Sequence, residues 1–121
     1  MFQVLKVLGV HDIYGSALKH ISSNGYSQHL TFDPYTGEVN IWGGILLACG
    51  AKKKKLREGA EEPEECGVIP KLYGVARVSC EYLEAYVDED ISRWCENHTY
   101  TDVRKLLQSA SDRIEISISS F

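Results

Sequence analysis

Cys95 and His98 are the two residues whose types and spacing could support catalysis or metal binding. A thiol three residues before an imidazole matches one half of a tetrahedral zinc site. A closed site needs a second pair of ligands, but the remaining cysteines and histidines are isolated from one another along the chain. We therefore expect no metal ion and no cofactor.

The same two residues supply the types of a nucleophile and its general base. Three further polar residues, Tyr100, His29 and Gln28, could complete a pocket around them. The chain lacks a Gly-x-Ser-x-Gly motif, a phosphate-binding loop and the dinucleotide-binding glycine pattern. A non-enzymatic protein is therefore the favoured hypothesis, and an enzyme or small-ligand module using a Cys95/His98 pocket is the alternative.

A charged segment, residues 52–67, is the second candidate binding site. Its first half holds five basic residues and its second half holds five glutamates. The basic half could bind phosphate or an acidic partner. We favour the other interpretation, a flexible solvated connector whose two halves neutralise each other. The lysines concerned are Lys52, Lys53, Lys54 and Lys55.

The composition is that of one acidic domain with a hydrophobic core. The 121 residues are 44% hydrophobic and carry a net charge of −4, which argues against general nucleic-acid binding. No apolar run approaches the roughly 20 residues of a membrane span. The N-terminal sequence lacks the basic start and cleavage site of a signal peptide, so we expect a cytoplasmic protein whose four cysteines are reduced.

Two amphipathic helices, at residues 72–87 and 101–114, must position the candidate residues. Both segments repeat apolar residues at helical spacing. The acidic run that follows the first is unfavourable at a helix C-terminus, so we expect that helix to end there. Thr101 could cap the second helix, and the pair Thr99 and Asp102 offers an alternative start.

The first half of the chain is expected to pack on this helix pair. A helix should begin at Asp12, its cap, and end at the Asn-Gly pair of residues 24–25. The most apolar run, residues 41–51, suits a buried helix. Gly43 and Gly44 lower helix propensity there, and the expected reason is close approach by another backbone.

Three shorter segments complete the sequence-based description. Residues 33–37 have strong turn chemistry and could close a small hairpin or a plain loop. A short helical turn should carry Trp94 into the core, where we favour a packing role over a binding anchor. Residues 115–121 alternate like a strand, with Ile116 and Ile118 on one face. This tail could pair with the N-terminal segment or with another subunit, which makes both isoleucines candidate interface residues.

The expected fold class is mainly α, with α+β as the alternative. We expect a single domain, a compact bundle of about four helices with short terminal or hairpin strands. The main core candidates are Trp42, Gly43, Gly44, Leu83, Trp94, Leu106 and Leu107, joined by Ile13, Ala17, Ile21, Ile45, Leu46, Leu72, Val75, Val103 and Ala110.

The chain resembles an uncharacterised domain family of bacteriophages and actinobacteria (domain of unknown function 6197). The resemblance lies in residues 24–28 after the first helix, the Trp-Gly-Gly-Ile run at 42–45 with Ala-Cys-Gly-Ala at 48–51, the Ile-Ser-Arg-Trp run at 91–94, and the helix from 101 to 110. Tyr26 stands where the family has Trp, and Cys95-Glu96 where it has Asn-Asp. The resemblance implies a small, mostly helical, phage-type protein, and it assigns no catalytic residue.

These observations favour a small phage-type accessory protein that acts by protein–protein interaction, with a host factor as its expected target. The alternatives are the small-ligand module or enzyme described above and a homo-oligomeric structural component of the virion. A protein partner, host or self, is expected in each interaction model, with no membrane contact. If phage-encoded, the protein would act in the cytoplasm of the infected cell.

Overall fold

The computed structural model of the protein describes the backbone of residues 2–119 and the side chains of residues 13–113. Over this part of the chain the fold is mainly helical and compact, which confirms the predicted fold class. None of the helices found there has the length and hydropathy needed to cross a membrane. The elements are α1 (Phe2–Asn24), α2 (Ile41–Ala48), α3 (Lys53–Arg57), the 3-10 turn η1 (Pro70–Leu72), α4 (Tyr73–Val87), α5 (Ile91–Glu96) and α6 (Tyr100–Ser119).

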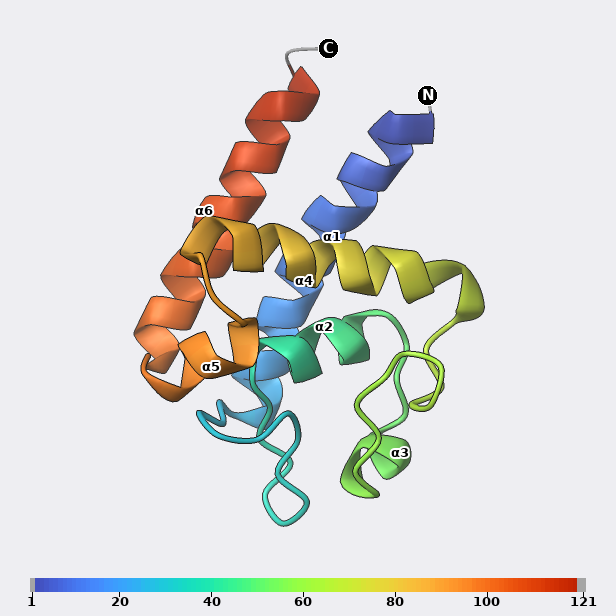
Figure 1. Ribbon diagram of the computed structural model, residues 1–121, viewed down its shortest axis with the longest axis vertical. Coiled ribbons are helices and arrows are strands. Elements are labelled where there is room, and N and C mark those ends of the chain that lie inside the picture. The colour runs from blue at the N-terminus through green and yellow to red at the C-terminus, as the bar shows by residue number, and fades with distance from the viewer. Residues whose placement is uncertain (1, 120–121) are drawn as a thin grey trace.

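The first and last helices form the long axis of the molecule. α1 and α6 pack side by side, although they lie at opposite ends of the sequence (Figure 1). α4 crosses α1, α2 packs on α1 as well, and α5 joins α4 to α6. The short α3 stands apart, at the end of the molecule away from the first turns of α1 (Figure 1).

Two glycines in α2 permit the tightest packing in the fold. The helix begins after Asn40, whose Oδ1 accepts a hydrogen bond from the Gly43 N–H at 2.9 Å. A Cβ on Gly43 would lie 2.1 Å from the carbonyl oxygen of Thr31, and a Cβ on Gly44 would lie 3.1 Å from that of Ala17. The predicted close backbone approach is therefore confirmed at both glycines, with the preceding loop on one side and α1 on the other.

Side-chain caps open α5 and α6. Asp90 Oδ1 accepts two backbone N–H groups from the first turn of α5. α6 begins at Tyr100, so Thr99 is its cap rather than Thr101. The Thr99 N–H donates to Asp102 Oδ2 at 3.1 Å, and the Asp102 N–H faces Thr99 Oγ1 at 3.5 Å. This reciprocal arrangement satisfies the free N–H groups of the first turn and confirms the second of the two predicted starts.

The predicted start of the first helix is wrong. α1 extends from Phe2 to Asn24, so Asp12 lies inside the helix and is not its cap, and Gly9 does not interrupt it. A glycine inside a helix costs on the order of 1 kcal/mol, which packing between long helices can offset. The predicted end is correct, since Gly25 takes a positive φ of 95° and its N–H donates to the Ile21 carbonyl oxygen at 2.8 Å.

The strand predicted for the tail is also wrong. Residues 115–119 continue α6, and residues 120–121 lie outside the described part of the chain. A single strand needs a partner, and the N-terminal segment proposed for that role is itself helical. The side chains of Ile116 and Ile118 lie outside the described residues, so their predicted interface role stays a prediction.

The turn at residues 33–37 closes a loop rather than a hairpin. The Gly37 N–H donates to the Asp33 carbonyl oxygen and the Asp33 N–H to that of Glu38, both at 2.8 Å. Only two isolated bridges accompany this turn, and both involve Val39, so residues 2–119 contain no strand.

The core follows the predicted helix faces closely. Most of the expected core residues have less than a tenth of their surface exposed, while Trp42, Leu72 and Val75 are half-buried at its edge. Trp42 Nε1 donates to the Glu61 carbonyl oxygen at 2.8 Å, so the edge position gives the indole its hydrogen-bond partner. Trp94 is 9% exposed, consistent with the predicted packing role.

The charged segment 52–67 has more structure than a solvated connector would have. It contains α3, and it buries the side chains of Leu56, Pro63 and Cys66. Its acidic half is bonded to α4 through Arg77, which contacts Glu64 at 2.6 Å and Glu62 at 3.4 Å. The apolar residues between the charges explain the difference, because they anchor the segment to the domain.

Asp88 ends α4 in a left-handed conformation with φ of 58°, which non-glycine residues rarely adopt. Its carboxylate also lies at the negative end of the helix dipole. We expect Asp88→Gly to raise the free energy of unfolding by about 0.5–1 kcal/mol, measured by urea denaturation. Asp88→Asn removes the charge but keeps a side chain, so it should give a smaller gain. A loss of stability in the glycine variant would contradict this explanation.

Candidate functional site

The loop between α1 and α2 is tied to the distant junction of α5 and α6. The Tyr26 hydroxyl lies 2.8 Å from the carbonyl oxygens of both Cys95 and His98 and can donate to either. Gln28 Nε2 donates to the His98 carbonyl oxygen at 2.9 Å. Burial raises the pKa of Tyr26 well above its usual value, so the hydroxyl keeps its proton at neutral pH. The loop is also held on the side facing α2, where the Asn40 N–H donates to the Thr31 carbonyl oxygen at 3.3 Å.

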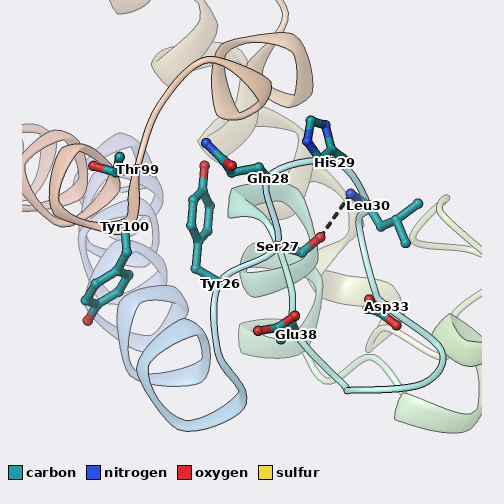
Figure 2. A pocket seen from close by; sticks show the side chains of 9 residues that line it. All are labelled: Tyr26, Ser27, Gln28, His29, Leu30, Asp33, Glu38, Thr99 and Tyr100. Carbon is teal, nitrogen blue, oxygen red and sulfur yellow. Dashed lines mark hydrogen bonds between the residues drawn. The ribbon is translucent and has the colours of Figure 1, made fainter.

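A polar pocket of about 460 Å³ opens between this loop and the start of α6. Figure 2 shows Thr99 and Tyr100 on the α6 side, and Asp33 and Glu38 across from them on the loop. The complete lining is Tyr26, Ser27, Gln28, His29, Leu30, Asp33, Glu38, Thr99 and Tyr100.

Two carboxylates give this pocket a negative charge. Asp33 Oδ1 accepts the N–H groups of Tyr35 and Thr36 at 2.9 and 3.2 Å, and Glu38 Oε1 accepts the Thr36 hydroxyl at 3.1 Å. Neither carboxylate forms an ion pair with another of the described residues. The pocket can therefore receive a hydrogen-bond donor or a cation from outside the chain.

Two large apolar side chains are exposed on the same loop. Leu30, which also lines the pocket, is 47% exposed, and Tyr35 at the tip of the turn is 96% exposed. The loop conformation fixes the Leu30 backbone, because its N–H donates to Ser27 Oγ at 3.0 Å (Figure 2). An ordered loop that exposes apolar side chains beside a polar pocket is typical of a recognition surface.

The structure does not assemble Cys95 and His98 into a catalytic pair. The Cys95 side chain is fully buried, and its burial raises the pKa of the thiol. The His98 ring stacks on Trp94 with 3.8 Å between ring centroids, and Nδ1 lies 2.6 Å from the Trp94 carbonyl oxygen. No hydrogen bond joins the thiol to the imidazole among the described side chains, and neither residue lines the polar pocket. The thiol therefore has no base to activate it.

Three residues of the alternative hypothesis do come together in the pocket, namely Gln28, His29 and Tyr100. His98 instead borders a separate groove of about 360 Å³ between α4, α5 and α6. Among the described residues, no group of three or more histidine, cysteine or acidic side chains is arranged to hold a metal ion.

Sequence reasoning missed the carboxylates and the apolar residues of the loop. The turn pattern marks Asp33 only as a turn residue and assigns no binding role to Leu30 or Tyr35. One other sequence feature does point to a binding role. Tyr35, a large aromatic residue, stands between Pro34 and Thr36 at the tip of a turn, where polar residues are usual. The side chains of Lys52 to Lys55 are exposed on and beside α3, outside this pocket.

The four cysteines are expected to be inert in the folded protein. Burial raises the pKa of Cys49 and Cys66 to about 11 and that of Cys80 to about 12. Nucleophilic attack requires the thiolate, so a disulfide-forming thiol reagent at pH 8 should modify the folded protein far more slowly than a small model thiol. The four thiols should react at once in strong denaturant. Rapid modification of one thiol before unfolding would show that its site is open.

The same pKa shifts predict loss of stability at high pH. A thiol with a raised pKa holds its proton more tightly in the folded than in the unfolded state, where the pKa is near 9.0. This contribution is complete below about pH 9 and is lost as pH rises through 11 to 12. The urea midpoint should be level from pH 7 to 8.5 and fall above pH 9. Cys80→Ala should show a smaller fall, and a level midpoint up to pH 11 would contradict the linkage.

Comparisons with family models, curated proteins and solved structures found no match to this chain. The resemblance to the phage and actinobacterial domain family therefore stays a prediction, and the functional argument rests on the geometry of the loop and its pocket.

Proposed function

We propose that this protein is a small accessory protein that acts by binding another protein. The binding surface is the loop of residues 26–38 together with the polar pocket beside it. The observation that carries the proposal is the exposure of Leu30 and Tyr35 on a loop whose conformation is fixed from both sides.

The chemistry of this surface suits a protein partner. Aromatic side chains contribute strongly to protein interfaces, and Tyr35 at the tip is available to enter a pocket on the partner. The carboxylates of Asp33 and Glu38 have no cation partner among the described residues, so they suit a basic side chain of the partner. The fixed loop also lowers the entropic cost of binding, because little remains to be ordered.

The resemblance adds the expectation that the protein is phage-encoded and that its partner is a host protein in the cytoplasm. An enzyme built on Cys95 and His98 has less support, because the thiol is buried and lies outside the pocket. The pocket residue Ser27 offers no clear substitute, since its hydroxyl already accepts the Leu30 N–H.

The test is recovery of a partner from a bacterial host with the tagged protein and a loop variant. Leu30→Ser/Tyr35→Ser should lose a partner that the wild type retains in stoichiometric amount. The matched control is Val78→Ser/Tyr86→Ser, which removes two apolar side chains that are 41% and 46% exposed on α4. The control should retain the partner. Equal recovery with the loop variant, or recovery of no partner by the wild type, would reject the proposal.

A further inference from the structure

The basic half of the charged segment forms a face of its own. Lys52 to Lys55 and Arg57 carry five positive charges within six residues, and each of these side chains is exposed. Leu56 is the one member of this run that is buried, at 3% exposure, so the charged residues lie on the exposed part of α3 and directly before it. We call these five residues the basic face.

The acidic half of the segment forms no ion pair with the basic face in the described part of the chain. Glu62 and Glu64 contact Arg77 of α4, and Glu61 accepts a hydrogen bond from the Thr31 hydroxyl. No lysine of the basic face forms an ion pair with another described residue. Direct ion pairs between the two halves are therefore absent among the described residues, and the lysine side chains remain available to a partner.

The basic face lies next to the tip of the loop of residues 26–38, which we call the recognition loop. Arg57 Nε donates to the Pro34 carbonyl oxygen at 3.3 Å, and the guanidinium carbon lies 5.6 Å from the centre of the Phe32 ring. These contacts bring α3 against the turn that carries the exposed Tyr35. Tyrosine and arginine are both enriched at the centres of protein interfaces, so the exposed Tyr35 ring beside the turn that Arg57 contacts suits one.

We propose that the basic face and Tyr35 together dock an acidic segment of a protein partner. This proposal rests on the proposed function, because it describes a second contact made by the same kind of partner. The pocket would receive a basic group and α3 an acidic one, so the two charges would set the orientation of the partner.

The neighbouring carboxylates favour an acidic protein segment over a nucleic acid. A nucleic-acid strand carries a phosphate at every nucleotide, and carboxylates lie close to α3: Glu58 follows it directly, and Asp33 precedes the Pro34 that Arg57 contacts. Binding of single strands also uses several stacked aromatic rings, whereas the exposed aromatic at this face is Tyr35 alone among the described residues. A short run of aspartate and glutamate can contact the lysines and end before these carboxylates.

The experiment measures binding of a fluorescein-labelled ten-residue peptide of aspartate and glutamate by fluorescence anisotropy at low ionic strength. Wild-type protein should bind this probe, and added salt should weaken binding, since exposed charges are screened within about 10 Å at 0.1 M salt. Lys54→Glu/Lys55→Glu should bind at least about tenfold more weakly. Lys54→Gln/Lys55→Gln should give a smaller loss in the same direction.

The matched control is Arg104→Glu/Lys105→Glu, which makes the same change in net charge at two exposed residues of α6. This control should bind within about twofold of wild type, and circular dichroism should show all variants folded.

An equal loss in the control, or no binding of the peptide by wild type at 1 mM protein, would overturn the proposal. Equal or tighter binding of an oligothymidylate of the same charge would overturn it in favour of nucleic acid. The peptide measurement is independent of the partner-recovery experiment with the Leu30→Ser/Tyr35→Ser variant. Failure of the peptide to bind would therefore reject this inference and leave the proposed function to its own test.

Discussion

Gly43→Ala is expected to be among the most damaging single substitutions in this protein. The added Cβ would lie 2.1 Å from the carbonyl oxygen of Thr31 and 3.0 Å from the Val39 Cβ. Backbone atoms on both sides of this contact must then move, and Asn40 loses the geometry in which it caps α2. Overpacking of this kind costs 1–3 kcal/mol or more, so we expect a loss of about 3 kcal/mol in the free energy of unfolding.

The measurement is urea denaturation, followed by a thermal melt that should show a midpoint lower by about 10 °C or more. Gly15→Ala in α1 is the matched control, because outside the helix's own backbone nothing lies within 4 Å of the position its Cβ would take. That variant should be more stable than wild type by about 0.5–1 kcal/mol, since alanine is the better helix former. A Gly43→Ala protein within 1 kcal/mol of wild type would show that the loop is free to move away from α2.

The same contact gives the substitution a functional effect. Thr31 lies in the recognition loop, so a variant that folds should hold that loop in a different position. We expect such a protein to lose partner binding even at temperatures where it remains folded.

Leu83→Ala is expected to be the second large effect. The leucine side chain is fully buried in α4, within the cluster shared by the central helices. Truncation of a buried leucine removes its transfer free energy and leaves a cavity, and together these cost 2–5 kcal/mol. Urea denaturation should give a loss in this range.

Val78→Ala tests the explanation on the same helix. Val78 is 41% exposed, so its truncation removes little buried surface and slightly favours the helix. Its free energy of unfolding should differ from wild type by less than about 0.5 kcal/mol. Similar losses for Leu83→Ala and Val78→Ala would mean that the packing face of α4 is assigned incorrectly.

The helices that carry local signals could be predicted from the sequence. α4 and α2 have apolar spacing or an apolar run bounded by turn residues, and α6 opens with the Thr99 and Asp102 pair. The glycines within α2 indicate that another backbone approaches the helix, but they do not indicate which one. The segment that approaches Gly43 is the loop at Thr31, which has no periodic sequence pattern by which its position could be predicted. The tail has an ambiguous pattern, because alternating isoleucine and serine fit a strand, whereas Ile114 also follows Ala110 at helical spacing.

The candidate site was harder to predict because its parts come from distant segments. The side chains of Tyr26 and Gln28 are held by hydrogen bonds to carbonyl oxygens about 70 residues away in the sequence. No local sequence pattern predicts hydrogen bonds of this kind. Cys95 and His98 are close in sequence, yet the helix turns the thiol into the core while the imidazole stacks on Trp94. Proximity along the chain was therefore a poor guide to which side chains share a pocket.

The packing of α1 against α6 also determines when this protein can fold. α1 is synthesised before α6, so α1 meets one of its main packing partners only after the helices between them have been made. Contacts of such large sequence separation slow folding and leave apolar surface exposed during synthesis. Nascent chains arrested before α6 emerges should therefore be sensitive to protease and bound by chaperones, and emergence of α6 should be the step that closes the core.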